Sequence, residues 1–395
     1  MSNTNPSTTH LNDEIKFLIA CCQTEPSKDD INFIHTYLNA ERLTLNALIP
    51  LANQHGILPL VYKTIKNLSP SDDPRSSHST LLSELKQRYM SIVQRNMLMT
   101  SELLRIMKLF KENEIEALAF KGPTLSQIAY GDITLRQYSD LDILVDEKIA
   151  YKAGELLQAH NFTAPYPLSI LKNRTCMRVD SDFAFVGNTN NILIEMHWRL
   201  FRKNIGHHLT FDQFSKDPQT VKINGMPIKT LSPELHLLYL SLHGSKHAWE
   251  RIEWIVDIDR FIRSNKLDKN KLKETLKLMQ ADRPILTGLL LAQRLFQTPL
   301  PDWIRKQITK DNEVEELYST TIQLLNDDFS NLNERQRART IYLYQRRFFR
   351  NHREKIKYFF ESYFSISRND CLEFPLPSAL NLLYIFIKPF RILKK

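Results

Sequence analysis

Asp140 and Asp142 stand two residues apart at the start of an apolar segment, SDLDILV at positions 139–145. Residues i and i+2 of a β-strand share a face, so the two carboxylates should project together. Neighbouring carboxylates repel each other unless a proton or a cation lies between them. Mg²⁺ prefers oxygen ligands and often holds the phosphates of a substrate. The pair therefore predicts a site for Mg²⁺, or Mn²⁺, that serves phosphoryl or nucleotidyl transfer.

Glu195 is the best candidate for a third acid, which two-metal transfer sites usually contain. It lies in another strand-like segment, ILIEMHW at positions 192–198, where a buried acid is costly unless it binds a metal or a partner. Leu193, Glu195 and His197 should share one face of that strand. We predict Asp140, Asp142 and Glu195 as the catalytic residues and metal ligands. An ion pair between Glu195 and Arg199 or another cation is the alternative.

Lys121 and Gly122 follow a short apolar segment, ALAF at 117–120, and precede a predicted short helix. A helix N-terminus offers free N–H groups to a phosphate. We predict that Gly122 lets the backbone approach the nucleotide, that Lys121 pairs with phosphate oxygens and that the Thr124 hydroxyl donates a hydrogen bond. On its own, such a strand–helix junction is a weak signal.

Three further residues are predicted to contact the nucleotide: Ser139, Arg136 and Lys246. Arg136 precedes the aspartates by four residues and could bind a triphosphate, with a solvated loop arginine as the alternative. Lys246 lies in the segment HGSKHAW at 243–249, whose residues could line the site or could instead pack the junction between two helices.

The composition restricts the partners without choosing one. The 395 residues carry a formal charge of +9, which permits nucleotides, nucleic acid or lipid headgroups. Nine glycines argue against a glycine-rich phosphate loop and suit a helical chain. The four cysteines match neither a zinc site nor a disulfide framework, and neither a signal-peptide pattern nor a membrane-spanning run is found. We therefore expect a cytoplasmic protein.

The hydrophobic periodicity predicts an α+β fold, in which a small mixed β-sheet is flanked by helical regions at both ends. We expect disorder over 1–10, an N-terminal helical region over 11–114, the α/β core over 115–230, a helical subdomain over 231–300 and a C-terminal helical region over 301–395. Two hairpins are expected within the core.

Two basic segments of the C-terminal region leave alternatives open. The apolar tail at 379–395 ends in lysines and arginines, so it could contact an anionic membrane peripherally or dock on the core of the protein as a terminal helix. Residues 333–364 look helical and mix arginines with aromatic residues. Nucleic-acid binding is conceivable there, and a basic helix face with apolar packing behind it is the alternative.

Several of these segments together resemble an uncharacterised bacterial nucleotidyltransferase family of the polymerase-beta-like nucleotidyltransferase superfamily. The matching segments are FKGPTL at 120–125, YGD at 130–132, LR at 135–136, SDLDILV at 139–145, IEMHWR at 194–199, HGSKHAW at 243–249 and WIVDI at 254–258. The resemblance covers roughly residues 95–300. It implies a minimal nucleotidyltransferase core with Asp140 and Asp142 as metal ligands and Glu195 as the third. The superfamily usually has Gly-Ser or Gly-Gly where this chain has Lys121-Gly122.

We accordingly predict an enzyme that moves a nucleoside monophosphate from an NTP, with ATP expected, to an acceptor hydroxyl with Mg²⁺ as cofactor. The acceptor is left open between a protein, an RNA, a sugar and a small molecule. One alternative is a non-catalytic member that binds nucleotide only. The other is an interaction protein of cell-surface polymer assembly that is associated with the membrane through 379–395.

Overall fold

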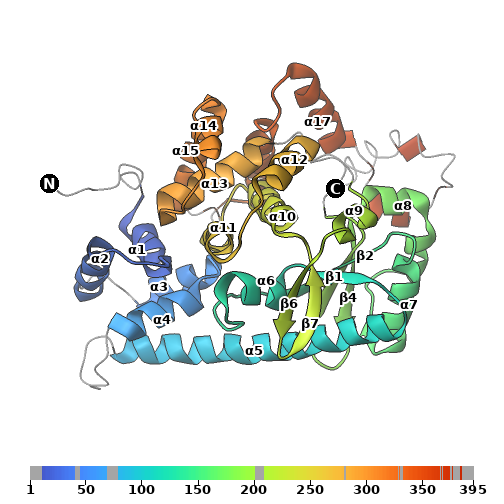
Figure 1. Cartoon of the computed structure of the whole chain (residues 1–395), viewed down its shortest axis with the longest axis horizontal. Coiled ribbons are helices and arrows are strands. Elements are labelled where there is room, and N and C mark those ends of the chain that lie inside the picture. The colour runs from blue at the N-terminus through green and yellow to red at the C-terminus, as the bar shows by residue number, and fades with distance from the viewer. Residues whose placement is uncertain are drawn as a thin grey trace.

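The computed structural model describes residues 11–40, 45–68, 79–200, 209–279, 282–327, 329, 332–364, 366, 368–373, 376 and 383–384. The helices that precede the sheet are α1 (Asp13–Cys22), α2 (Lys28–Asn39), α3 (Leu45–Gln54), α4 (Leu58–Leu68) and α5 (Ser79–Glu112). Helix α5 runs beneath most of the molecule and passes below the sheet (Figure 1). It lies within residues 11–114, which were predicted to be helical.

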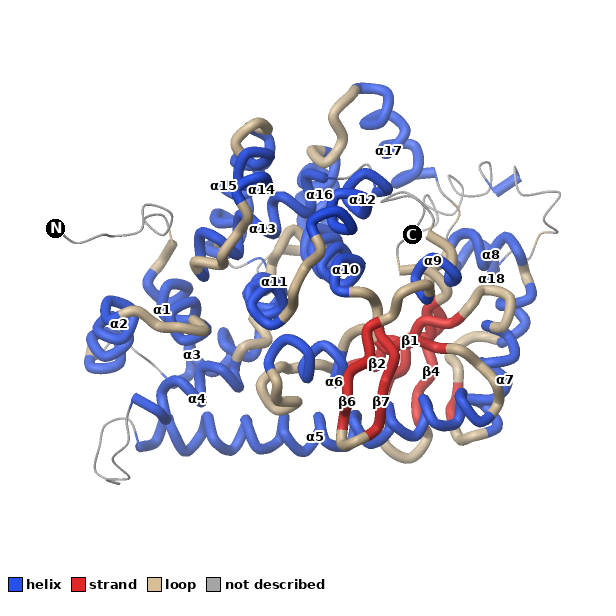
Figure 2. The backbone as a smooth tube through the Cα atoms, in the orientation of Figure 1, coloured by secondary structure: helices blue, strands red, loops and turns tan. Residues whose placement is uncertain are grey.

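A five-stranded sheet has the order β1-β2-β5-β4-β3. Its strands are β1 (Ala117–Ala119), β2 (Asp140–Val145), β3 (Phe162–Thr163), β4 (Asp182–Gly187) and β5 (Leu193–His197). Strands β2 and β5 run parallel, whereas the other neighbouring pairs are antiparallel. Figure 2 shows this small sheet surrounded by helices. The predicted α+β class with a small mixed sheet is confirmed.

Short elements connect the strands. They are α6 (Gly122–Leu125), the π-helical turn η1 (Ser126–Tyr130), α7 (Ala150–Ala159), the 3₁₀ turn η2 (Leu168–Lys172), α8 (Arg174–Val179) and α9 (Phe211–Ser215). A separate hairpin of β6 (Gln219–Ile223) and β7 (Met226–Thr230) turns at Asn224 and Gly225. Both turn residues have positive φ, as a tight hairpin turn requires. The two predicted hairpins, β4–β5 and β6–β7, are therefore present.

The chain after the sheet is helical wherever it is described as regular structure. Its helices are α10 (Pro233–Lys246), α11 (Ile252–Ser264), α12 (Lys269–Met279), α13 (Asp282–Phe296), α14 (Asp302–Ile308), α15 (Asn312–Asn326), α16 (Glu334–Arg346), α17 (His352–Phe364) and α18 (Arg368–Glu373). Ser232 caps α10, with its side chain accepting a hydrogen bond from the Leu235 amide. Among the described residues, none of these helices has the length and apolarity needed to cross a bilayer.

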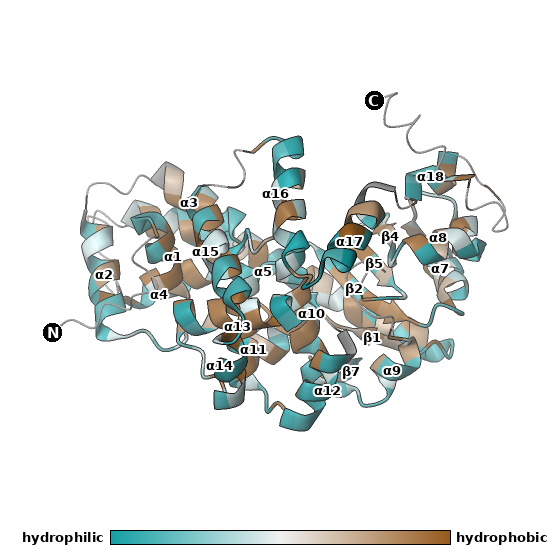
Figure 3. Ribbon diagram, turned by 90° about the horizontal axis from the view of Figure 1, so that it is seen from above, coloured by the Kyte–Doolittle hydropathy of each residue, from teal (hydrophilic) through white to brown (hydrophobic). Residues whose placement is uncertain are grey.

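The two faces of β2 enter different parts of the core, because side chains alternate along a strand. Leu141, Ile143 and Val145 are buried in a cluster with apolar residues of α5 and α7. Leu144 joins a second cluster that includes Phe120 and the buried side chains of α10, α11 and α13. In Figure 3 these three helices carry much of the hydrophobic colour at the centre of the molecule. The odd-numbered residues of β2 thus anchor the strand, and Asp140 and Asp142 lie on the face that looks towards α10.

Residues 333–364 are helical, as predicted, with one interruption. Residues 333–364 form two helices, α16 and α17, with a break after Arg346. The break lets Tyr342 of α16 stack on Tyr358 of α17, with ring centroids 5.5 Å apart and planes 8° from parallel. The expectations for 1–10 lie outside the described residues, as do those for 379–395 apart from 383 and 384.

Candidate active site

Two of the predicted acids face each other across neighbouring strands. Asp142 of β2 is directly opposite Glu195 of the parallel strand β5. Ligand atoms of Asp142, Glu195 and His197 all lie within 4.8 Å of one another. Asp140 is outside this closest group, yet its pKa responds to both Asp142 and Glu195. The parallel pairing of β2 with β5 therefore brings together acids that are more than fifty residues apart in sequence.

His197 completes this group and was not among the predicted site residues. Its Nε2 lies 3.1 Å from Asp142 Oδ1 and 3.4 Å from Glu195 Oε2. Burial alone would lower the pKa of His197, but its hydrogen bonds with Asp142 and Glu195 raise that pKa to about 9. The sequence did hold a signal for it, because His197 is two residues from Glu195 and shares its face of the strand.

Lys121 reaches the same carboxylate from the end of β1. Its Nζ is 2.7 Å from Asp142 Oδ1, and it also lies 5.6 Å from the centre of the Tyr239 ring. Burial disfavours the charged lysine, but attraction by Asp142, with further help from Tyr239 and Asp140, holds the pKa of Lys121 well above its usual value. The predicted phosphate-binding lysine is therefore paired with a site acid in this structure.

The two aspartates have opposite electrostatic environments. Burial, together with the charges of Asp142 and Glu195, raises the pKa of Asp140 to about 6. Asp142 is more deeply buried, and burial alone would raise its pKa too, but Lys121 and His197 lower it to about 2. Asp142 thus stays ionised, whereas the predicted repulsion between the two carboxylates helps to raise the pKa of Asp140.

The acid cluster retains unused ligand capacity that fits a divalent cation. Among the described residues, no group forms a hydrogen bond with Asp142 Oδ2 or with His197 Nδ1, although both atoms are buried. A buried polar atom without a partner is costly, and such atoms are often explained by an ion or a water. The carboxylate oxygens of Asp142 and Glu195 are the donors that Mg²⁺ and Mn²⁺ prefer, and His197 adds a nitrogen that Mn²⁺ accepts.

The predicted nucleotide-binding junction sits directly against the aspartates. Gly122 has a φ of +50°, and a Cβ placed there would lie 3.3 Å from the backbone oxygen of Asp140. Thr124 is fully buried, and its hydroxyl has no hydrogen-bond partner among the described residues. Ser139, immediately before the pair, is exposed. The close approach of two backbone segments therefore explains why a glycine stands at 122.

Arg136 and Lys246 are placed differently from the other predicted contacts. The guanidinium of Arg136 is buried and donates to both carboxylate oxygens of Asp257 in α11, at 2.9–3.1 Å. Tyr130 donates a further hydrogen bond to Asp257, at 2.7 Å. Lys246 is exposed at the end of α10. The hydrogen bonds of Arg136 are thus made to Asp257 of α11. Contact of Arg136 or Lys246 with a triphosphate remains a prediction.

Aromatic and imidazole rings of α10 and α11 form a row that begins beside Lys121. Tyr239 neighbours His243, which in turn contacts His247 and Trp254, with centroids 5.2–5.8 Å apart. Burial and nearby cations lower the pKa of His247 to about 3, so its ring is neutral. Trp249 is fully buried in the core. The i, i+4 histidines thus pack against rings, and no third ligand joins them among the described residues.

A cavity of about 640 Å³ opens at the carboxyl ends of β2 and β5. Asp146 and Glu147, which follow β2, line it together with Trp198 and Arg199, which follow β5. Arg199 is paired with Glu147 at 2.6 Å, whereas the cation beside Glu195 is His197, at 3.4 Å, so the alternative of an ion pair with another cation stays open. The volume falls within the range of small-molecule sites.

One comparison with known proteins assigns this chain to a family. The family described as uncharacterised nucleotidyltransferase matches residues 42–297, which is more than half of the chain. This protein therefore belongs to that family, and its general chemistry is nucleotidyl transfer. The match begins earlier than the predicted resemblance, because it includes α3, α4 and all of α5. Searches of curated proteins and of solved structures returned no match.

Proposed function

We propose that this protein transfers a nucleoside monophosphate from an NTP, with ATP the expected donor, to an acceptor hydroxyl in a reaction that requires Mg²⁺ or Mn²⁺. The observation that carries the proposal is the convergence of Asp142 and Glu195, with a buried Asp142 oxygen that no described residue satisfies. Family membership supports the class of reaction, and the oxygen-rich donor set supports the cofactor.

In the proposed reaction, the acceptor oxygen attacks the α-phosphorus, the bond to the β-phosphate oxygen breaks and pyrophosphate leaves. Asp140, Asp142 and Glu195 would hold the cation, which would neutralise phosphate charge and ease deprotonation of the acceptor. Glu195 is the more accessible of the facing acids, with 31% of its side chain exposed. It is therefore proposed to orient the acceptor hydroxyl and receive its proton.

Lys121 is proposed to exchange partners when the nucleotide binds. Its ammonium neutralises Asp142 in the free protein, at 2.7 Å. A cation bound by Asp142 would repel that ammonium, and the triphosphate would supply new oxygens for it. The buried Thr124 hydroxyl, the Gly122 backbone and Ser139 are proposed as candidates for further phosphate contacts. Arg136 is proposed to act indirectly, by fixing the segment before β2 to α11.

The acceptor is proposed to enter through the cavity at the ends of β2 and β5. Asp146 is four positions after Asp142, which corresponds to about 13 Å along an extended chain. Lys148, Lys172, Arg174 and Arg178 line the cavity besides the Arg199–Glu147 pair, against the acids Asp146 and Asp212. This balance favours an acceptor that carries negative charge.

The test is transfer of α-phosphate label from NTPs to a panel of proteins, RNAs, sugars and small hydroxyl compounds with Mg²⁺ or Mn²⁺. Asp142→Asn should abolish labelling, whereas Asp302→Asn should not, because Asp302 is an exposed residue of α14. Calorimetric binding of ATP without transfer to any acceptor would favour the non-catalytic alternative. Labelling that persists in Asp142→Asn would refute the metal site.

A further inference from the structure

Helix α17 exposes an apolar stripe that the transfer reaction does not use. Ile356 is 57% exposed, Phe359 is 41% exposed and Phe360 is 55% exposed. Positions i, i+3 and i+4 share one side of a helix, so the three side chains form a continuous strip. Leu343 of the neighbouring α16 is also 47% exposed. Half of the eight large apolar residues that are exposed in the described part of the chain therefore lie on these two helices.

The buried side of α17 explains how the stripe comes to face outwards. Tyr358 is buried, donates a hydrogen bond to the Gln345 side chain and stacks on Tyr342. Residues two positions from Tyr358 point to the opposite side of a helix, and these are Ile356 and Phe360. The anchoring of α17 on α16 through Tyr358 therefore fixes the orientation of the stripe. Figure 1 places α17 at the edge of the molecule, away from the sheet.

Positive charge is concentrated around the stripe. Residues 334–364 contain nine arginines and lysines against three glutamates, so they carry six of the nine excess positive charges of the chain. Arg347 and Arg350 are held in ion pairs with acids of the core. Arg353 and Lys357 lie along one edge of the stripe, and Lys355 lies on the other side. Arg353 and Lys357 are exposed and can extend past the apolar side chains.

We propose that the exposed face of α17 docks on an anionic lipid surface. Apolar side chains flanked on both edges by cations are the pattern of a helix that lies in a membrane interface. Nucleic-acid surfaces use cations with stacking aromatic rings between them, and the aliphatic Ile356 at the centre of the stripe does not suit that role. The docking is independent of the transfer reaction and would bring the enzyme to acceptors at a membrane.

The test is flotation of the full-length protein with vesicles of phosphatidylcholine, with and without phosphatidylglycerol. We expect flotation with the anionic vesicles and its loss at high salt. Ile356→Ser combined with Phe360→Ser should weaken partition by at least about tenfold, since each change removes a large apolar side chain from the interface. Arg353→Gln combined with Lys357→Gln should weaken it by about thirtyfold, at roughly 1 kcal/mol for each cation near the surface.

The matched control is Met97→Ser combined with Leu98→Ser on α5, where the side chains are 59% and 58% exposed. It should float as the unchanged protein does, and thermal unfolding checks that all variants are folded. Absence of flotation with anionic vesicles would overturn the proposal. So would flotation that survives the α17 changes but is lost on truncation to 1–375. A mobility shift with single-stranded RNA, weakened by Arg353→Gln and Lys357→Gln in the absence of flotation, would assign the surface to nucleic acid instead.

Discussion

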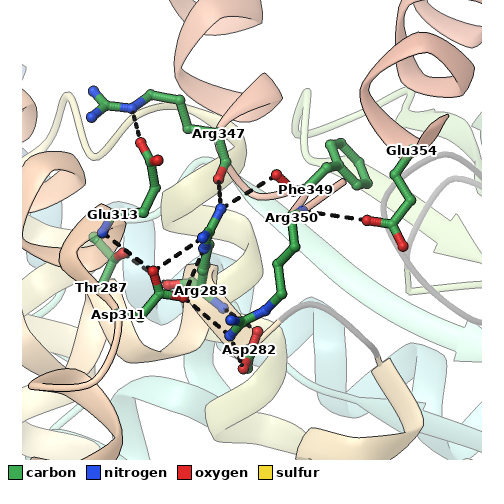
Figure 4. A network of polar contacts seen from close by, with 9 residues as sticks. All are labelled: Asp282, Arg283, Thr287, Asp311, Glu313, Arg347, Phe349, Arg350 and Glu354. Carbon is green, nitrogen blue, oxygen red and sulfur yellow. Dashed lines mark hydrogen bonds and ion pairs between the residues drawn. The ribbon is translucent and has the colours of Figure 1, made fainter. Parts of the chain in front are cut away.

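Two clusters of charged residues in this protein handle their charges in opposite ways. One is the acid cluster of β2 and β5. The other is the arginine network that joins α13, α15 and the loop between α16 and α17 (Figure 4). In the network, Arg283 donates to both oxygens of Asp311, at 2.8 Å and 3.0 Å, and also to the backbone oxygens of Arg347 and Phe349. A single arginine thus saturates its donors on one acid and two carbonyls.

The rest of the network is similarly matched. Arg350 contacts Asp282 at 2.7 Å and Asp311 at 3.1 Å, and Arg347 pairs with Glu313. Three arginines thus face four acids, because Arg347 also lies 3.6 Å from Glu316. Arg283 and Asp311 form a bidentate pair within this network. The acid cluster instead sets Asp140, Asp142 and Glu195 against Lys121 and His197, and it leaves a buried oxygen of Asp142 without a described partner. The arginine network connects helices, whereas the buried Asp142 oxygen without a described partner indicates a site for a ligand.

The largest effect should follow from removing a charge at the acid cluster. Asp142→Asn should reduce nucleotidyl transfer by at least about a thousandfold, because it removes a proposed cation ligand. The free energy of unfolding should also fall, because the buried Lys121 and His197 lose the carboxylate that pairs with both of them. Label transfer and urea unfolding on the same preparations measure both quantities. Full activity of Asp142→Asn would show that the acid cluster, like the arginine network, has no role in transfer.

Removing an acid from the arginine network should lower stability and leave nucleotidyl transfer intact. Asp311→Asn should lower the free energy of unfolding by about 2–4 kcal/mol, because Arg283 and Arg350 lose a shared and nearly buried partner. Transfer by the folded variant should remain near the unchanged level, since Asp311 is the N-cap of α15 and this helix lies away from the sheet (Figure 1). Urea unfolding gives the first value and label transfer gives the second. A large loss of activity without a loss of stability would contradict this division.

The contribution of Asp311 to stability should also be lost at low pH. Burial alone would raise the pKa of Asp311, but Arg283 and Arg350 outweigh it and hold that pKa below its usual value. A lowered pKa means that the stability from this acid is present above the pKa of the unfolded chain, about 4, and is lost as the pH falls further through the folded value. The unchanged protein should therefore lose more stability below about pH 4 than Asp311→Asn does. Parallel acid dependences would contradict the expectation.

A smaller effect is expected where the backbone supports the acid cluster. Gly122→Ala should lower the free energy of unfolding by about 1–3 kcal/mol, because position 122 has positive φ and the new Cβ would press on the Asp140 backbone oxygen. Gly131→Ala is the matched control, since Gly131 also has positive φ but has nothing within 4 Å of the added carbon. The difference between the two unfolding energies measures the contact. Equal values would show that the backbone conformation alone accounts for the cost.

The smallest effect is direct binding of the cation. Millimolar Mn²⁺ or Mg²⁺ without nucleotide should raise the free energy of unfolding by about 1 kcal/mol, a shift of about one degree in Tm. Asp142→Asn should lose this shift and Asp311→Asn should keep it. An identical shift in all three proteins would mean that the ions bind elsewhere.

Much of the site could be predicted from local patterns. The alternation of SDLDILV places Asp140 and Asp142 on one face, and the alternation of ILIEMHW places Glu195 on the working face of its own strand. The pairing of β2 with β5, and hence the meeting of Asp142 with Glu195, depends on contacts between distant segments. The family resemblance implied it, but periodicity alone could not. The changes in hydrophobic period along the chain predicted the small mixed sheet between helical regions.

The residues that pattern could not place are those whose partners are distant in sequence. Arg136 binds Asp257, which is 121 residues away, and the sequence around either residue does not predict this ion pair. Lys121 was expected to meet a phosphate, yet in the free protein it satisfies Asp142. The relative placement of α16 and α17 depends on the stack of Tyr342 on Tyr358, which lie 16 positions apart. A single position carries no information about such long-range partners.

The bond between Arg136 and Asp257 also limits how this chain can be divided. Both side chains are buried, and one precedes β2 while the other belongs to α11. A fragment that ends at residue 230 would keep the sheet but would leave Arg136 and Tyr130 facing a vacant position within apolar surroundings. Breaking a buried ion pair in this way costs about 3–5 kcal/mol. We therefore expect the strands and the helices that follow them to unfold as one unit, and a shortened catalytic fragment to need α11.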